Sequence, residues 1–208
     1  MGLKLVPINT LTDTRKKILH AAYKCLAQTG FTRLTVDEIA LRAGISRKII
    51  FHNYKGLKNL LSDLGESSFY WPSTEELLAN APEDFPNICP EKQVGAYFLS
   101  LRKELEERPE TLRIMAWEML ERSDLSEELE DVRVRTALEF FENLGPDVPD
   151  EVDLAAAIAL VGGGISYLAI RSLNTKTYGG VSLQDEIGWE RLEHAMHCML
   201  KGLLFPQI

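Results

Sequence analysis

The sequence predicts an all-α protein of about nine helices. Apolar residues recur at helical spacing along most of the 208 residues, whereas the alternating pattern of strands is nearly absent. Proline and glycine clusters such as Gly145-Pro146 separate the periodic segments. The chain is 45% hydrophobic and long enough to bury a substantial core. We expect two short helices between residues 35 and 54, a helical turn at 74–79, and longer helices over 14–28, 56–69, 91–107, 110–122, 125–144, 151–173 and 185–204.

A helix-turn-helix motif is expected between Thr35 and Tyr54. Thr35 and Glu38 have the T-x-x-E spacing of a capping box, in which each side chain satisfies a backbone N–H near the other. Gly44 can take the left-handed conformation that ends a helix, and Ser46 can cap the next one. The outer face of this second short helix is cationic and aromatic. Such a face suits a helix that enters the major groove of DNA, so the motif predicts a DNA reader.

The charge of the chain is unevenly distributed. The net charge is −8, but residues 1–64 hold 11 Lys/Arg and 4 Asp/Glu, a balance of +7, and residues 65–208 hold 12 and 27, a balance of −15. Charges farther apart than about 10 Å are largely screened at ~0.1 M salt. A basic N-terminal segment can therefore bind DNA although the rest of the chain is acidic. The alternative is an ordinary fluctuation of charge along the sequence.

Composition argues against a membrane or secreted protein. No run of 18 or more apolar residues occurs, so no membrane span is predicted. Residues 1–9 contain one Lys and no long apolar stretch, which argues against a secretory signal. The cysteines Cys25, Cys89 and Cys198 are odd in number and far apart, which favours a reducing compartment. We therefore expect a cytoplasmic protein without a metal or cofactor.

Residues 14–61 contain a series of elements in a specific order: Ile18-Leu19-His20-Ala21-Ala22, Gly30-Phe31, Leu34-Thr35-Val36, Ile39-Ala40, Ala43-Gly44-Ile45-Ser46, Ile50-Phe51, Tyr54 and Leu60-Leu61. With these elements the segment resembles the DNA-binding domain of the TetR (tetracycline repressor) family of bacterial regulators. The resemblance covers about a quarter of the chain, and it is specific in the order and spacing of its elements. The C-terminal part is similar to the family only in being helical and of suitable length.

The resemblance implies a DNA-binding domain over residues 10–56 and a helical effector-binding and dimerisation domain over 57–208. Three positions depart from the family pattern: Phe51 replaces a Tyr and Leu57 a Lys, both of which commonly contact phosphate, and Lys48 replaces a small residue. By position, Arg47, Lys48 and Ile49 are candidates for base edges. The full set of candidate DNA-binding residues is Thr35, Arg47, Lys48, Ile49, Phe51, His52, Asn53, Lys55 and Lys58.

The last two predicted helices are candidates for a dimer interface. Segment 151–173 contains Gly162-Gly163-Gly164, and each glycine in a helix interior costs about 1 kcal/mol relative to alanine. Close approach of another helix, or a kink around a ligand, would explain this cost. The resemblance implies that 151–173 and 185–204 pair with their copies in a homodimer, which suits a palindromic double-stranded DNA operator. The alternative is that both apolar stripes are intramolecular core.

The resemblance also implies a small organic effector between the middle helices, and thus a repressor that the effector releases from its operator. Aromatic and methionine residues at helical spacing are more often core than ligand contacts. A helical protein–protein adaptor is the main alternative, and a metal-dependent enzyme using His194, His197 and Cys198 is a weaker one. No catalytic motif occurs, so we expect no enzyme. The candidate effector-pocket residues are Trp71, Tyr97, Phe98, Met115, Trp117, Met119 and Phe140.

Overall fold

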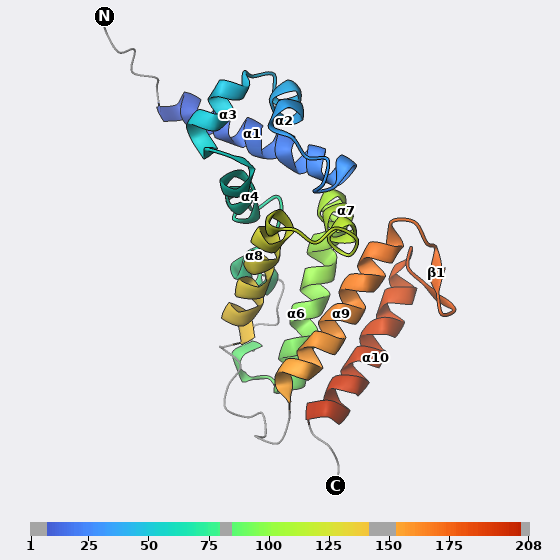
Figure 1. Ribbon diagram of the computed structural model, residues 1–208. Helices are drawn as coiled ribbons and strands as arrows, with labels where there is room; N and C mark the ends of the chain where they lie inside the picture. Colours follow the sequence, from blue (N-terminus) through green and yellow to red (C-terminus); the bar gives the residue numbers. More distant parts are fainter. Residues whose placement is uncertain (1–7, 80–84, 142–152, 205–208) are drawn as a thin grey trace, which may run out of the picture. The chain divides into compact units, whose positions relative to one another are not determined.

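The computed structural model describes residues 8–79, 85–141 and 153–204 (Figure 1). The all-α prediction is confirmed, with ten α-helices in these residues instead of about nine. A short 3-10 helix and a two-stranded antiparallel hairpin, with Tyr178 opposite Val181, were not predicted. The elements are α1 (Ile8–Thr29), α2 (Val36–Ala43), α3 (Arg47–Tyr54), α4 (Leu57–Gly65), α5 (Thr74–Leu78), η1 (Phe85–Asn87), α6 (Pro90–Glu106), α7 (Pro109–Glu118), α8 (Asp124–Phe141), α9 (Leu154–Ser172), β1 (Thr177–Tyr178), β2 (Val181–Ser182) and α10 (Glu186–Leu204).

Several helix ends differ from the prediction, and α1 begins at Ile8, six residues before the predicted start. The turn expected at 74–79 is a capped helix, because the Ser73 hydroxyl accepts from Glu76 N (3.2 Å) and the Glu76 carboxylate accepts from Ser73 N (2.8 Å). Helix α4 ends at Gly65 and α7 at Glu118, both about one turn earlier than expected. Residues 142–144 and 151–152 of the predicted helices lie outside the described residues.

The chain forms two compact units. The first consists of residues 1–71 and 113–133, and the second of residues 72–112 and 134–208. Helix α4 and parts of α7 and α8 therefore belong to the same unit as the helix-turn-helix segment. The predicted functional division into 10–56 and 57–208 does not follow these units, and it stays a prediction.

The core of the first unit lies between α1, α2 and α4. Helix α1 buries Ile18, Ala22 and Leu26 completely, and Ile39 and Leu60 close the core from α2 and α4. Each of the buried isoleucine and leucine side chains contributes about 1.5–3 kcal/mol relative to an exposed one. The apolar stripe of α1 that the sequence indicated is therefore the wall of this core.

A buried ion pair joins α7 to α8 within the first unit. Arg133 donates to Glu118 Oε1 (2.9 Å) and to Tyr70 Oη (2.6 Å), and its guanidinium lies 5.8 Å from the Trp71 ring centroid. Both charged side chains are mostly buried, at 15% and 13% exposure. Burial raises the pKa of Glu118, and the positive charge of Arg133 opposes that shift. Arg133 therefore stabilises the ionised carboxylate of Glu118 in a buried position, where an unpaired charge would cost folding free energy.

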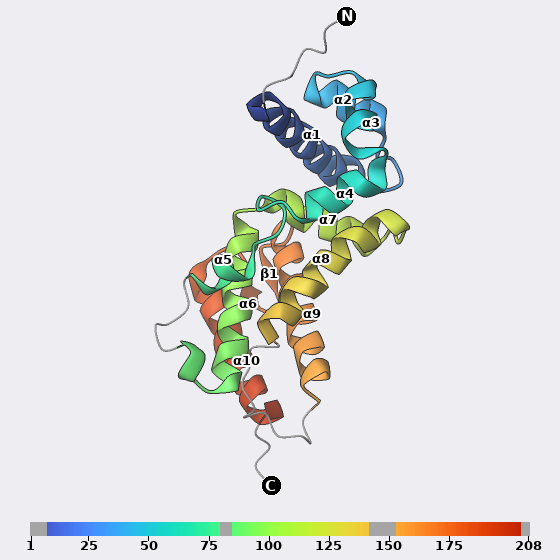
Figure 2. The ribbon, with the colours of Figure 1, turned by 90° about the vertical axis from the view of Figure 1, so that its left-hand side faces the viewer.

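The second unit is built around α6, which contacts α9, its neighbour in Figure 1, and α10, its neighbour in Figure 2. A Cβ at Gly162 of α9 would lie 2.8 Å from the ring of Phe98, so the two helices approach closely at this glycine. The Tyr97 ring packs against those of Phe140 and Phe141, with centroids 4.4 and 5.1 Å away. Aromatic packing of this kind makes the centre of the unit apolar and rigid.

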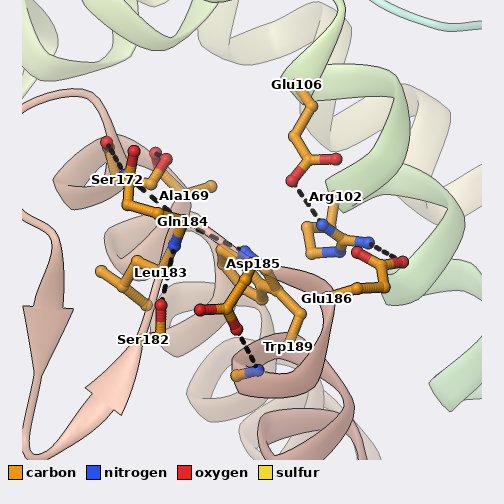
Figure 3. A network of polar contacts seen from close by, with 11 residues as sticks. Arg102, Glu106, Ala169, Ser172, Ser182, Leu183, Gln184, Asp185, Glu186 and Trp189 are labelled. Carbon is orange, nitrogen blue, oxygen red and sulfur yellow. Dashed lines mark hydrogen bonds and ion pairs between the residues drawn. The ribbon is translucent and has the colours of Figure 1, made fainter.

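Polar contacts fasten the hairpin to the helices on either side of it (Figure 3). Gln184 Nε2 donates to Ser172 O at the end of α9 (2.8 Å), and Gly188 N donates to Asp185 Oδ1 at the start of α10 (2.8 Å). The buried Arg102 guanidinium lies 4.8 Å from the Trp189 ring centroid. These contacts satisfy helix ends that would otherwise lack partners, and they fix the connection between α9 and α10.

Helix α9 is unusually apolar for its exposure. Its best 18-residue window has a mean hydropathy of 1.7, yet only 28% of that window is buried. By length and composition it is the one helix of the described residues that could cross a membrane. Core helices of other proteins meet the same criterion, so the helix is weak evidence for a membrane. Its exposed apolar face still requires a physical explanation.

Candidate nucleic-acid interface

The turn between α2 and α3 forms largely as the sequence indicated. Thr35 Oγ1 accepts from Glu38 N (3.2 Å), and Gly44 adopts φ 65° to end α2. Two details of the prediction were wrong. The Glu38 carboxylate accepts from the Thr35 hydroxyl (3.3 Å) instead of the backbone N–H, so only half of the capping box forms. Ser46 occupies the N-cap position of α3, but its side chain makes no capping hydrogen bond.

Helix α3 separates an inner face from an outer one. Ile50 and Tyr54 are buried in the unit, whereas Ile49 and Phe51 are 38% and 40% exposed. The remaining exposed side chains of the helix are Arg47, Lys48 and His52. Leu57, which stands where the family commonly has a Lys, is half-buried at the first position of α4. The outer face is therefore cationic with two apolar side chains, and a duplex can reach it.

Several of the predicted DNA-binding side chains already have partners. Arg47 lies 3.4 Å from Asp37 Oδ1 and 5.4 Å from the Phe51 ring centroid. Asn53 Nδ2 donates to Ile49 O (2.7 Å), and Lys58 Nζ lies 3.0 Å from Glu128 Oε1. Exposed ion pairs of this kind contribute about 0–1 kcal/mol, so a phosphate or base can replace them at small cost. Asp37 and Glu128 were not among the predicted residues.

A polar network fixes α3 against α1 and α4. Arg15 donates two hydrogen bonds to the Asp63 carboxylate (2.8 and 2.9 Å), and the Tyr54 hydroxyl donates to the same carboxylate (3.0 Å). Burial raises the pKa of Tyr54 to about 12, so the hydroxyl stays protonated and remains a donor at neutral pH. Sequence analysis missed this network, because its members are 9 to 48 positions apart.

A second contact holds the turn that follows α1. The Glu121 carboxylate accepts from Phe31 N (2.7 Å) and Thr32 N (3.0 Å), and Trp117 Nε1 donates to Ala27 O (3.3 Å). The backbone N–H groups of Thr32 and Phe31 lower the pKa of Glu121. Gly30 (φ 75°) leaves no room for a side chain, since a Cβ would lie 2.8 Å from Glu121 Oε2. No sequence signal linked segments 90 residues apart.

The seven predicted effector residues are divided between the two units. Trp71, Met115, Trp117 and Met119 belong to the first, and Met119 is 58% exposed. The other three, Tyr97, Phe98 and Phe140, belong to the second, where all are buried. Their role as the lining of an effector pocket stays a prediction.

The residues of the alternative metal site point in different directions. His194 Nε2 lies 3.8 Å from Cys198 Sγ on the exposed side of α10. His197 instead lies against Gly95 of α6, 2.6 Å from where a Cβ would stand. In the part of the chain that the structure describes, no three or more His, Cys, Asp or Glu side chains are placed to hold a metal ion. The arrangement gives the enzyme alternative no support.

The family model described as "Bacterial regulatory proteins, tetR family" matches residues 18–64, the segment that forms the core, the turn and α3. The segment 18–64 belongs to the TetR family. This family comprises regulators and not enzymes, in agreement with the sequence prediction. An uncharacterized HTH-type transcriptional regulator of Mycobacterium tuberculosis is 34% identical to this chain over 56 residues. That match covers 27% of the chain, and the chain spans only 30% of the relative's length.

Solved structures share the fold over nearly the whole chain. NalD, the secondary repressor of the MexAB-OprM multidrug efflux pump in Pseudomonas aeruginosa, is 16% identical with a TM-score of 0.65, covering 96% of this chain and 100% of that one. FadR of Bacillus subtilis, solved with stearoyl-CoA, is 14% identical with a TM-score of 0.63, covering 93% and 99%. At these identities the likeness establishes the all-helical fold of the chain.

Proposed function

We propose that this chain is a transcriptional regulator of the TetR family that binds operator DNA through α3, in the bacterial cytoplasm. One observation carries the proposal: α3 exposes Arg47, Lys48 and Ile49 beside a left-handed turn at Gly44 and buries its other face. These three side chains would contact base edges, and Thr35, Phe51, His52, Asn53, Lys55 and Lys58 would contact the backbone.

An Arg47→Ala variant tests the reading of bases. We expect about a 5- to 150-fold loss of affinity for the operator, because a bidentate arginine–guanine contact gives about 1–3 kcal/mol of discrimination. Affinity for mixed-sequence DNA should change far less. The operator is first obtained by sequencing genomic fragments that the purified protein retains, and affinities are then measured by fluorescence anisotropy at fixed salt. Arg122→Ala, an exposed arginine outside α3, is the control. Equal losses on both DNAs would reject base reading by Arg47.

A Lys55→Gly variant should change stability and DNA binding in opposite directions. Lys55 has φ 59°, and it is the one non-glycine residue of the described chain with positive φ. Glycine adopts this conformation without strain, so we expect the variant to be more stable by about 0.5–1 kcal/mol. Loss of a phosphate contact should weaken binding to all DNA sequences alike and reduce the salt slope by about one unit. Thermal unfolding and binding at several salt concentrations measure both effects, and Lys55→Arg should keep the wild-type slope.

We further propose a homodimer formed through α9 and α10. The exposed face of α9 contains Leu160 (67% exposed) together with Gly163 and Gly164, and α10 exposes Ile187 (71%) and Met199 (54%). No other part of the described chain lies within 4 Å of a Cβ at either glycine. A second copy would cover this apolar face and explain why glycines are tolerated there. Two-fold symmetry would match a palindromic operator with half-sites about 34 Å apart, or a multiple of it.

The proposed regulator is a repressor released by a small, moderately hydrophobic organic effector. NalD is described as a repressor and FadR was solved with stearoyl-CoA, which supports both parts of this proposal by analogy. The buried aromatic cluster around Tyr97, Phe98 and Phe140 is the apolar region of the second unit where such a molecule would bind. An effector can change DNA affinity only by its differential affinity for two shapes of the dimer.

A further inference from the structure

Helix α10 presents a histidine and a cysteine together on its exposed side. His194 Nε2 lies 3.8 Å from Cys198 Sγ, and the two residues are four positions apart. Residues with this spacing share one face of a helix, so the backbone holds the two side chains side by side. Both residues are exposed, and Cys198 is a free thiol. Within the described part of the chain neither side chain forms another hydrogen bond or ion pair, so both remain available to a ligand from solvent.

The separation of these two atoms suits a zinc ion. Zinc binds cysteine sulfur at about 2.3 Å and histidine nitrogen at about 2.0–2.1 Å, so two such ligands of a tetrahedral ion lie about 3.5 Å apart. His194 Nε2 and Cys198 Sγ, at 3.8 Å, are close to this separation, and a small rotation of either exposed side chain would complete the fit. Thiolate and imidazole are also the ligands of structural zinc sites.

One chain supplies only half of such a site. His197 lies on the same helix, but its ring packs against Gly95 of α6 and so faces away from the exposed pair. Among the described residues of a single chain, no three His, Cys, Asp or Glu side chains are placed to hold one ion. Structural zinc almost always has four protein ligands. The other two ligands would therefore have to come from a second protein molecule.

The histidine and the cysteine lie on the side of α10 that the proposed dimer would cover. Ile187, Arg191, His194 and Cys198 are all exposed, and they follow one another at intervals of four, three and four positions. Helices that pack lengthwise against each other use this heptad spacing. Helix α9, with its exposed apolar face, lies beside α10 (Figure 1). Near a two-fold axis a residue meets its own copy, so this pair can face the same pair of a second chain.

We propose that His194 and Cys198 of two copies of this chain bind one zinc ion between them. The proposal rests on the homodimer through α9 and α10 proposed above. Two thiolates and two imidazoles would satisfy the tetrahedral preference of zinc, which neither copy can satisfy alone. The ion would bind the dimer and not the separated chains, so zinc would strengthen dimerisation by mass action. Its role would be structural, because all four coordination positions would be filled by protein.

Metal titration of the reduced, chelator-treated full-length protein tests the proposal. We expect one zinc ion per two chains, and cobalt(II) in its place should give the visible absorption of a tetrahedral site together with a thiolate charge-transfer band. Cys198→Ser and His194→Gln should each weaken zinc binding by about 100-fold or more, since loss of even an outer partner of a ligand costs about 10–100-fold. Cys89→Ser, which removes another free thiol, is the matched control and should bind zinc as the wild type does.

Three results would overturn the zinc site: no zinc binding, one ion per chain, or undiminished binding in Cys198→Ser. Both substituted side chains are exposed, so the variants should fold, and thermal unfolding without metal verifies this.

Sedimentation with and without zinc distinguishes failure of the zinc site from failure of the proposed dimer. At free zinc about 100 times its dissociation constant, the dimer dissociation constant should fall about 100-fold in the wild type and stay unchanged in Cys198→Ser. A metal-free dimer that binds no zinc would overturn the zinc site alone. A chain that stays monomeric with and without zinc would overturn both the site and the dimer.

Discussion

An Arg133→Met variant is expected to lose about 3–5 kcal/mol of unfolding free energy at pH 7, because it leaves the buried Glu118 carboxylate without its charged partner. Burial already raises the pKa of Glu118, and removing Arg133 removes the main interaction that opposes the shift. Urea unfolding followed by circular dichroism measures the loss. A decrease below about 1 kcal/mol would show that the pair is well solvated.

The same variant should be less impaired at low pH. In Arg133→Met the folded-state pKa of Glu118 lies above its unfolded value, so the folded state binds the extra proton. The stability that this proton contributes is present below the unfolded pKa, and it is lost as the pH rises through the folded pKa. Unfolding measured from pH 5 to pH 8 should therefore show stability falling with pH in Arg133→Met more steeply than in the wild type. Adding Glu118→Gln removes the titrating group and should abolish this extra slope.

The Arg133→Met substitution should also affect DNA binding. Trp117 of α7 binds the last turn of α1, and Glu121, three residues after α7, binds the turn that follows α1. Lys58 and Glu128 hold α8 to α4. The pair formed by Glu118 and Arg133 connects α7 to α8. Loss of the pair would loosen both supports of the helix-turn-helix segment at once. The first compact unit therefore includes, beyond the DNA-reading helices, the parts of α7 and α8 that hold them.

The sequence was sufficient to predict the parts of this arrangement that depend on local chemistry. The apolar stripe of α1, the left-handed stop at Gly44 and the inward face of α3 each arise from residues within a few positions of one another. Their spacing alone determines them. The resemblance over residues 14–61 also rests on these local patterns. The family match over residues 18–64 agrees with it.

The contacts that sequence analysis missed join distant segments. Glu121 binds backbone N–H groups about 90 positions away, and any exposed glutamate would look the same in the sequence. The sequence predicted only a break between two helices at residues 177–182, because two-residue strands leave almost no alternating pattern of apolar and polar residues. The aromatic residues grouped as one effector pocket fall in two compact units, since helical spacing does not reveal which helices are neighbours.

Adjacent glycines of α9 should respond in opposite ways to substitution. In Gly163→Leu the Cβ would have no atom of another described segment within 4 Å and the position is exposed, so the single chain should fold with slightly higher helix stability, by up to about 1 kcal/mol. In the proposed dimer the same side chain meets its copy. Overpacking costs about 1–3 kcal/mol at each of the two sites, so the dimer dissociation constant should rise about 30-fold or more.

Gly162→Ala is the matched control, because its methyl group points into the core and not toward the proposed partner. A Cβ there lies 2.8 Å from the buried Phe98 ring, which must shift, so we expect a loss of about 1–3 kcal/mol in unfolding free energy. Its dissociation constant should remain that of the wild type. Analytical ultracentrifugation over a range of concentrations measures dissociation, and palindromic DNA binding should weaken only in Gly163→Leu, since half-sites on one duplex require two linked heads. A Gly163→Leu protein that sediments as the wild-type dimer would place the interface elsewhere, and the exposed apolar face of α9 would then need another partner.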